Sequence, residues 1–260
     1  MIIGISGHIG SGKDTVGKII QYLDDKETKL SFEEWLKPKI HPTGYDIGGA
    51  STYETYDSRR NPNSWRIKKY AAKLKEVASI LTGIPVEKFE DQEFKKTFLD
   101  ESWDIRDINH RYDSKSGEPI YISISVREFL QKLGTEAIRD NIHPNAWVNA
   151  LFADYKSKPE FTGSAYEESG RVEIYPNWII TDVRFPNEAQ AIKDRDGIIV
   201  RVNRFKSTDR IAGVGGTHLS HPSETSLDNW EFDYVIDNQG TIDELIGKVR
   251  AMLLKFEILK

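Results

Sequence analysis

Short apolar blocks alternate along this chain with glycine-rich turns and with segments whose apolar residues recur at helical spacing. Residues 1–5 form an apolar run too short for a helix, and Gly7 stops it, which is typical of a buried parallel strand. Apolar residues then recur at helical spacing from Val16 to Leu23, and the acidic pair at 24–25 ends that pattern. The chain is therefore predicted to begin as strand, glycine-rich turn and helix.

The middle of the chain is more polar. From residue 26 to about residue 65 it contains His-Pro, Gly-Gly and Asn-Pro pairs and few aliphatic residues, which indicates an insertion. The pattern then predicts a helix over 71–81, one or two short helices over 85–99 and a polar loop over 100–119. We group residues 26–125 as a polar insertion with helices.

Two helices are predicted next. A short strand over 120–124 leads to Ser125, which with Glu128 forms a capping box for a helix that runs to residue 138. Pro144 suits a first helical position, so a second helix is expected over 145–155.

The last third of the chain returns to alternating strands and helices. The elements expected there are a polar link over 156–175, a strand over 178–183, a helix over 186–195, a strand over 198–202, a glycine-rich loop, a strand over 233–236 and a last helix capped by Thr241 and Glu244. Strands that alternate with helices predict an α/β fold with a doubly wound, mostly parallel sheet and helices on both faces.

Composition narrows the class of protein. The 260 residues allow one large domain, or a core with a sizeable insertion. The 36 basic and 41 acidic side chains give a net charge of −5, which argues against non-specific binding to nucleic acid. The absence of cysteine excludes disulfides, thiolate nucleophiles and thiolate metal sites. No apolar run approaches the ~18 residues of a membrane span, and the first residues lack a basic leader, so we expect a soluble cytoplasmic protein.

The glycine-rich turn carries the most specific motif. Gly7, Gly12 and Lys13, with Gly10 and Ser11 between them, have the spacing of a P-loop. In such a loop backbone N–H groups surround phosphates at a helix N-terminus, and the lysine reaches the β and γ oxygens. The alternative is an ordinary glycine turn with a surface lysine, which the strand and helix on either side make less favourable.

One position departs from that motif. Asp14 stands where a serine or threonine would reach a metal ion, with Thr15 beside it. A carboxylate can hold Mg²⁺ directly or through water, whereas the alternative is an acidic first-turn residue favoured by the helix dipole. A second candidate group stands at the end of the 178–183 strand, where Asp182 is placed like a Walker B acid, and Arg184 and Glu188 follow it. The alternative there is a surface ion pair between Arg184 and Glu188.

The helix after Ser125 carries a stripe formed by Arg127, Gln131 and Gly134. A mid-helix glycine indicates that something packs against bare backbone, either a nucleotide or a neighbouring helix. Trp147 can stack on a base, but its apolar neighbours favour core packing. The basic, glycine-containing segment 204–220 is either a lid or a solvated loop.

Taken together, these residues resemble the phage-type deoxynucleoside monophosphate kinases, a family of P-loop nucleotide kinases. The matching segments, from one end of the chain to the other, are SGKDT (11–15), KLKEVASILTG, VREFLQKLGTEAIRD followed by NAWV, ITDVRFPNEAQAI, HPSET (221–225) and DYVIDNQGTIDEL. The aspartate in GKDT is the variant that this family uses, so Asp14 becomes support for the resemblance.

The resemblance implies a single P-loop kinase domain over 1–260, with acceptor-site helices over 126–157. It implies that ATP is held by the loop residues Gly7, Gly10, Ser11, Gly12, Lys13, Asp14 and Thr15, and Mg²⁺ by Asp14, Thr15 and Asp182. It further implies an acceptor site formed by Arg127, Gln131, Gly134, Thr135, Trp147 and Arg184, and a reaction centre formed by Lys13, Asp14, Arg127, Asp182, Arg184 and Glu188. It assigns no role to the HPSET segment.

The expected reaction is transfer of the ATP γ-phosphoryl group to a deoxynucleoside monophosphate, with ATP and Mg²⁺ required and no nucleic-acid or membrane partner. Alternatives are another small-molecule P-loop kinase, of the dephospho-coenzyme A or phosphomevalonate type, and a P-loop ATPase that acts on a protein partner. The bases accepted, the selectivity for deoxyribose and the oligomeric state, a homodimer included, are left open.

Overall fold

The computed structural model describes residues 1–25, 29–37, 64–106, 113, 116–161, 171–204 and 225–259. It divides into two compact units, one formed by Met1–Lys69 with Phe152–Lys260 and the other by Tyr70–Leu151. Residues 38–63 of the predicted insertion, most of the candidate lid and residues 221–224 of the HPSET segment lie outside the described residues.

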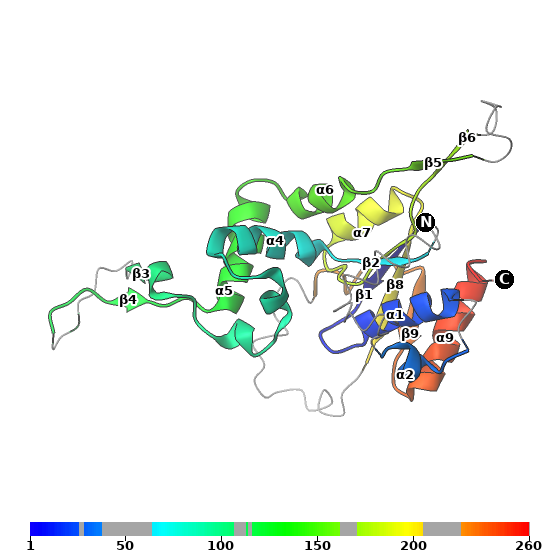
Figure 1. Cartoon of the computed structure of the whole chain (residues 1–260), viewed down its shortest axis with the longest axis horizontal. Coiled ribbons are helices and arrows are strands. Elements are labelled where there is room, and N and C mark those ends of the chain that lie inside the picture. Colours follow the sequence, from blue (N-terminus) through cyan, green and yellow to red (C-terminus); the bar gives the residue numbers. More distant parts are fainter. Residues whose placement is uncertain are drawn as a thin grey trace, which may run out of the picture. The chain divides into compact units, whose positions relative to one another are not determined.

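The first unit is built on a five-stranded parallel sheet (Figure 1). Its strands, in spatial order, are β2 (Arg66–Lys68), β7 (Trp178–Ile180), β1 (Ile2–Ser6), β8 (Ile198–Asn203) and β9 (Tyr234–Asp237). The central strand β1 is buried along its whole length and pairs in register with β7 and β8, with Gly4 opposite Ile180 and Ile199. This sheet confirms the predicted α/β fold.

Helices cover both faces of that sheet (Figure 1). On one face α1 (Lys13–Asp24) and α9 (Ile242–Lys255) contribute Val16, Ile20 and Val249 to a core that they share with Ile3 and Ile5 of β1. Successive strand residues point to opposite faces, so Gly4 faces the other way. There α7 (Pro186–Lys193) approaches so closely that a Cβ on Gly4 would lie 2.7 Å from the Ile192 side chain.

Part of the predicted insertion belongs to this unit's core. The short helix α2 (Phe32–Trp35) and Trp65 pack into the same core as α1, and Phe32 lies 5.3 Å from the ring of Tyr22. Strand β2 is the edge strand of the main sheet beside β7. The prediction that residues 26–125 form one polar insertion is therefore wrong at these positions, because a few aromatic side chains replace the aliphatic residues that the pattern relied on.

A small antiparallel ribbon also belongs to the first unit. Strands β5 (Lys158–Phe161) and β6 (Arg171–Ile174) pair within the segment expected to be a polar link. Beside it Tyr155 packs edge-on against Trp178, with ring centroids 4.8 Å apart.

The second unit is mostly helical. Its elements are α4 (Tyr70–Thr82), the 3₁₀ turns η1 (Val86–Glu90), η2 (Phe94–Lys96) and η3 (Glu101–Trp103), the strands β3 (Ile105–Arg106) and β4 (Tyr121–Ile122), α5 (Val126–Gln131), the π-helix η4 (Lys132–Asp140) and α6 (Ala146–Phe152), which ends at the boundary with the first unit. Phe89, Val126 and Phe129 form the centre of its own core.

Two predicted helices of this unit differ from the observed ones. The helix expected over 126–138 begins as predicted, with the Ser125 hydroxyl accepting a hydrogen bond from the Glu128 N–H at 3.2 Å, but it widens into the π-helix at Lys132. The helix expected over 145–155 is shorter, and Pro144 precedes it rather than occupying its first turn. Capping signals thus placed one start correctly and did not reveal the change of helical pitch.

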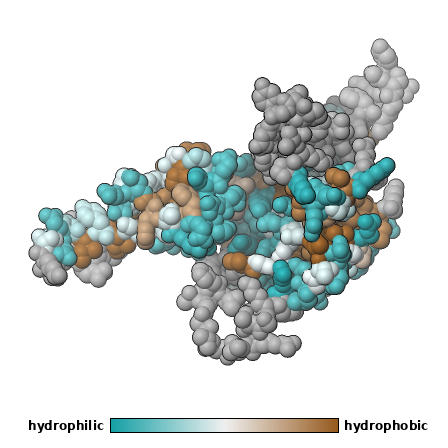
Figure 2. Space-filling model, turned by 60° about the horizontal axis from the view of Figure 1, so that its bottom comes forward, coloured by the Kyte–Doolittle hydropathy of each residue, from teal (hydrophilic) through white to brown (hydrophobic). Residues whose placement is uncertain are grey.

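The described surface is mixed in character. Figure 2 shows hydrophilic residues over much of the face in view, interrupted by groups of hydrophobic residues. In the second unit Phe98, Ile105 and Tyr121 are more than half exposed. No described helix has both the length and the apolar character needed to cross a bilayer.

Candidate active site

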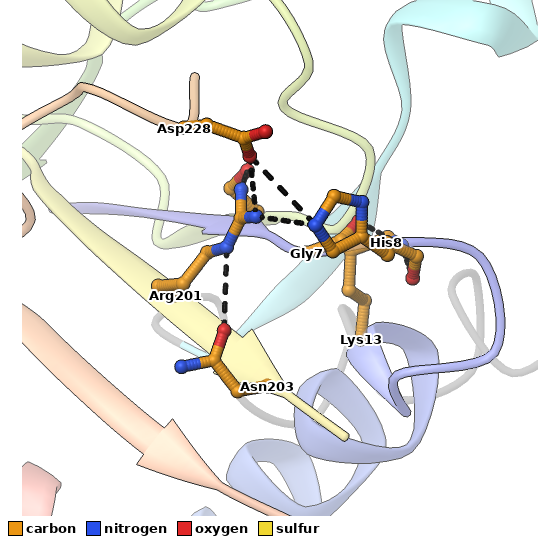
Figure 3. Close-up of polar contacts among 7 residues, drawn as sticks. Gly7, His8, Lys13, Arg201, Asn203 and Asp228 are labelled. Atoms are coloured by element: carbon orange, nitrogen blue, oxygen red, sulfur yellow. Dashed lines mark hydrogen bonds and ion pairs between the residues drawn. The ribbon is translucent and has the colours of Figure 1, made fainter. Parts of the chain in front are cut away.

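The loop between β1 and α1 folds around its own lysine. The Ser11 N–H donates to the His8 carbonyl at 3.1 Å and closes a tight turn. The Lys13 ammonium donates to the carbonyl oxygens of Gly7 at 2.6 Å and His8 at 2.8 Å (Figure 3). The cation therefore lies over the loop, where a phosphate group can exchange for these carbonyl partners.

Two glycines in this loop are required by geometry. Gly12 is the N-cap of α1 with φ +100°, a left-handed conformation, and a Cβ there would lie 2.5 Å from the Asn238 amide nitrogen. A Cβ on Gly7 would collide with the carbonyl oxygen of Val202 on β8. A side chain at either position would push the loop away from the sheet, so the glycines keep the loop backbone close to the sheet.

Asn238, which is far from the loop in the sequence, supports the loop through a side-chain hydrogen bond. It follows β9, is buried, and donates from its side-chain amide to the Ser11 carbonyl at 2.9 Å. The buried Ser11 hydroxyl makes no hydrogen bond within the part of the chain that the structure describes. Sequence reasoning included Asn238 in a family segment without assigning it a role. The available signal was its position directly after a strand, since the carboxyl ends of parallel strands share one edge.

Asp14 is held from two neighbouring strand ends. The Thr181 hydroxyl, directly after β7, donates to one Asp14 oxygen at 2.7 Å, and the Lys69 ammonium, directly after β2, lies 3.0 Å from the same oxygen. Partial burial by itself would raise the pKa of Asp14, but the Thr181 hydrogen bond, then Lys69 and the charge of Lys13, lower that pKa below its ordinary value. Asp14 is therefore an anion at neutral pH. Sequence reasoning missed both Thr181 and Lys69.

Asp182, Arg184 and Glu188 lie where β7 turns into α7, as their order in the sequence requires. Asp182 and Arg184 are partly exposed, whereas Glu188 is 2% exposed. The Glu188 carboxylate accepts hydrogen bonds from the backbone N–H groups of Arg184 at 2.8 Å and Phe185 at 3.1 Å. Glu188 is therefore buried and not a surface side chain, and its carboxylate fixes the backbone that carries Arg184.

The donor set suits Mg²⁺. This ion takes one or two carboxylates, completes its shell with water and substrate phosphates, and does not need a cage of protein ligands. Asp14 offers an exposed, ionised carboxylate in the first turn after the loop, and Thr15 and Asp182 are the further oxygen ligands proposed from the sequence. Within the described ranges no three His, Cys, Asp or Glu side chains converge on a metal site.

The predicted acceptor residues all belong to the second unit, apart from Arg184. Trp147 is buried, and its indole N–H donates to the Gly134 carbonyl at 2.8 Å. A Cβ on Gly134 would lie 3.0 Å from the Leu74 side chain of α4. The neighbouring helix therefore accounts for Gly134, and core packing accounts for Trp147, so base stacking by Trp147 rests on the family resemblance alone.

The polar members of that group are more accessible. Arg127 lies on α5 and donates to the Gln92 side chain at 3.4 Å, while Gln131 is exposed and Thr135 is partly exposed. Arg127 and Gln131 lie on α5, and Thr135 lies on η4, which continues it.

A parallel sheet with a glycine loop and lysine between its first strand and helix, and with acids at the adjoining strand ends, defines a P-loop kinase fold. The model of the deoxynucleotide monophosphate kinase family matches residues 1–249, and the chain belongs to that family. It is 26% identical over 237 residues to the deoxynucleoside-5'-monophosphate kinase of Escherichia phage T5, covering 87% of this chain and 85% of the relative.

Two further relatives match about half of the chain. Identity with the deoxynucleotide monophosphate kinase of Enterobacteria phage T4 is 30% over 131 residues, or 50% of this chain and 45% of the relative. The enzyme of the same name from Escherichia phage RB69 is 25% identical over 131 residues, with the same shares covered.

Proposed function

We propose that this protein transfers the γ-phosphoryl group of ATP to a deoxynucleoside monophosphate and releases a deoxynucleoside diphosphate and ADP. The observation that carries the proposal is the loop that holds Lys13 over backbone carbonyls at the start of α1, in a chain that belongs to the deoxynucleotide monophosphate kinase family. ATP is the donor in this proposal, and the setting is the cytoplasm, the host's for a phage-encoded chain.

Lys13 and the loop amides take the donor phosphates. The ammonium exchanges its contacts with the Gly7 and His8 carbonyls for the β and γ oxygens of ATP, and the backbone N–H groups at the start of α1 complete the cradle. Mg²⁺, when bound, neutralises charge on the β and γ phosphates. Asp14, Thr15 and Asp182 are the residues that would hold it.

The acceptor phosphate needs no strong general base. Its second pKa is near 6, so at neutral pH it is already an anionic nucleophile. Catalysis then depends on holding two polyanions in line and on balancing charge as the phosphoryl group moves. Lys13, Arg127 and Arg184 supply positive charge for that task, and Gln131 and Thr135 supply polar contacts to the acceptor.

The direct test is a coupled assay of ADP release with ATP, Mg²⁺ and a panel of deoxynucleoside and nucleoside monophosphates, with products identified by chromatography. Lys13→Ala should abolish transfer while the fold stays intact, because the lysine serves a loop and not the core. Lys18→Ala is the matched control, since Lys18 is an exposed lysine on the same helix. Near-normal turnover in a folded Lys13→Ala protein would contradict the proposal.

The same assay separates the alternatives. A dephospho-coenzyme A or phosphomevalonate kinase would release ADP only with its own acceptor, and a P-loop ATPase acting on a protein partner would release ADP with no small acceptor. Acceptor-dependent ADP release that tracks a deoxynucleoside monophosphate excludes both.

A further inference from the structure

Arg201 is a buried cation beside the phosphate loop, and the proposed chemistry does not use it. It lies on β8, next to β1, and is 8% exposed. Its guanidinium donates to the Asp228 carboxylate at 2.8 Å and to the Ser6 hydroxyl at 3.4 Å, and its carbon lies 5.4 Å from the centre of the Phe232 ring. A charge buried this far requires such partners, so the side chain is held in one position.

One of its contacts reaches the loop itself. The same guanidinium nitrogen that meets Asp228 lies 3.0 Å from Nε2 of His8 (Figure 3). His8 follows Gly7, and its carbonyl accepts hydrogen bonds from both the Ser11 N–H and the Lys13 ammonium. The backbone of His8 therefore shapes the loop, while its ring is anchored outside the loop on β8.

The contact joins the His8 ring to β8. An arginine only donates, so in a hydrogen bond between the two side chains Nε2 of His8 is the acceptor. The nearest Asp228 oxygen lies 3.7 Å from Nε2, beyond hydrogen-bond distance. The contact between Arg201 and His8 thus links β8 to the loop, and Asp228 orients the arginine.

We propose that Arg201 is a positioning residue that fixes the phosphate loop for ATP through the ring of His8. The proposal rests on the proposed function, because it takes the loop to be the ATP site. A loop already fixed loses little entropy when the phosphates bind, whereas a loop without its anchor must be ordered by ATP itself. Loss of the contact between Arg201 and His8 should therefore weaken the binding of ATP and leave the binding of the monophosphate unaffected.

His8 variants give the cleanest test, since they leave the buried ion pair intact. His8→Leu removes the acceptor and keeps an apolar side chain of moderate size, while His8→Gln keeps an acceptor oxygen. Loss of one hydrogen bond to a charged group should raise KM for ATP about tenfold in His8→Leu. KM for the monophosphate should change less than about twofold, and His8→Gln should recover most of the loss.

A double-mutant cycle tests whether Arg201 acts through His8. Arg201→Met should raise KM for ATP as His8→Leu does, and the double variant should be no worse than the poorer single variant, because both remove the same contact. Arg195→Met is the matched control. Arg195 also contacts an aromatic ring, that of Phe152, and donates to a backbone carbonyl, that of Ala191. Neither contact is with the phosphate loop, so the KM of the Arg195→Met protein for ATP should be unchanged.

Equilibrium titration with ATP keeps this proposal separate from the proposed function. If the unaltered protein binds ATP but transfers no phosphoryl group, the proposed function fails, and the Kd of His8→Leu for ATP still decides the role of Arg201. If the unaltered protein does not bind ATP, both fail. An unchanged KM and Kd for ATP in His8→Leu, or an equal rise in both KM values, would overturn the proposal even where Arg201→Met does not fold.

Discussion

Asp14 illustrates how one residue can serve both the fold and the ligand. It lies in the first turn of α1, where a negative charge is favoured by the helix dipole, and it accepts hydrogen bonds from Thr181 and Lys69, which follow strands β7 and β2. The two roles proposed for Asp14 from the sequence, a first-turn acid favoured by the helix dipole and a ligand of Mg²⁺, are therefore compatible. The two partners also hold the first turn of α1 against the ends of β7 and β2, which fixes the position of the loop beside the sheet.

The lowered pKa of Asp14 predicts an acid-sensitive part of the stability. A carboxyl whose pKa is lower in the folded state adds stability above its unfolded pKa and loses it as the pH falls through the folded value. The free energy of unfolding of the unaltered protein and of Asp14→Asn should therefore differ by a constant amount above about pH 5 and converge as the pH falls below the ordinary value of 3.8. Denaturant titrations in metal-free buffer measure both curves, and curves that stay parallel would contradict the prediction.

At the scale of an element, Glu188 determines how helix α7 begins. Its buried carboxylate accepts two backbone N–H groups at the start of α7, so it sets the direction in which the chain leaves β7. Glu188→Gln should lower the free energy of unfolding by about 1–3 kcal/mol, because the amide group places a donor where the site provides donors. Asp194→Asn, at the exposed end of the same helix, should cost less than about 0.5 kcal/mol.

Kinetics of the same variant separate positioning from chemistry. A Glu188→Gln protein of unchanged stability but strongly reduced kcat would place the carboxylate in the reaction centre, as the family resemblance implies. If Glu188→Gln instead lowers the stability, and kcat falls only because Arg184 is displaced, then Glu188 acts as a helix cap and not in the reaction centre.

The contact between Trp147 and Gly134 joins α6 to the π-helix η4. Trp147→Phe keeps an aromatic ring but removes the indole N–H, which leaves the Gly134 carbonyl without that donor. We expect a loss of about 1–3 kcal/mol in the free energy of unfolding, with KM values for ATP and the monophosphate affected alike. A selective rise in KM for the monophosphate at unchanged stability would instead support base stacking.

The elements that the sequence predicted well are those whose signals are local. The strand before Gly7, the helix after Lys13 and the cap at Ser125 depend on periodicity and capping within a few residues, and the structure confirms them. Strand β2 and the core position of Trp65 depend instead on partners distant in the chain, such as β7, which no local pattern reveals.

The candidate site divides in the same way. The glycines and Lys13 form a motif with fixed spacing, so they could be read directly. Thr181, Asn238 and Arg201 meet the loop only because the strands that carry them are parallel and end at the same edge of the sheet. Their partners become visible only once the order of the strands is known.

At the scale of the whole molecule, the residues assigned to the two substrates fall into different units, apart from Arg184 of the acceptor group, which lies in the first unit. The loop, Asp14 and the β7–α7 turn belong to the unit formed by Met1–Lys69 and Phe152–Lys260, whereas Arg127, Gln131 and Thr135 belong to Tyr70–Leu151. Each unit has its own core, so a ligand bound to one can stabilise that unit locally.

This division predicts that each substrate protects a different part of the chain. Hydrogen exchange of the full-length protein with ADP alone should slow at Gly7 to Asp14 and at the first turn of α1, because phosphate binding occupies those amides. Exchange with a deoxynucleoside monophosphate alone should slow within α5 and η4, from Arg127 to Thr135, and leave the loop unchanged. At a ligand concentration of about 100 times Kd the stabilisation of the bound form is ~2.7 kcal/mol, which is ample for a clear slowing of exchange. A monophosphate that protected only the loop, or ADP that protected α5 and η4, would show that the acceptor site has been assigned to the wrong unit.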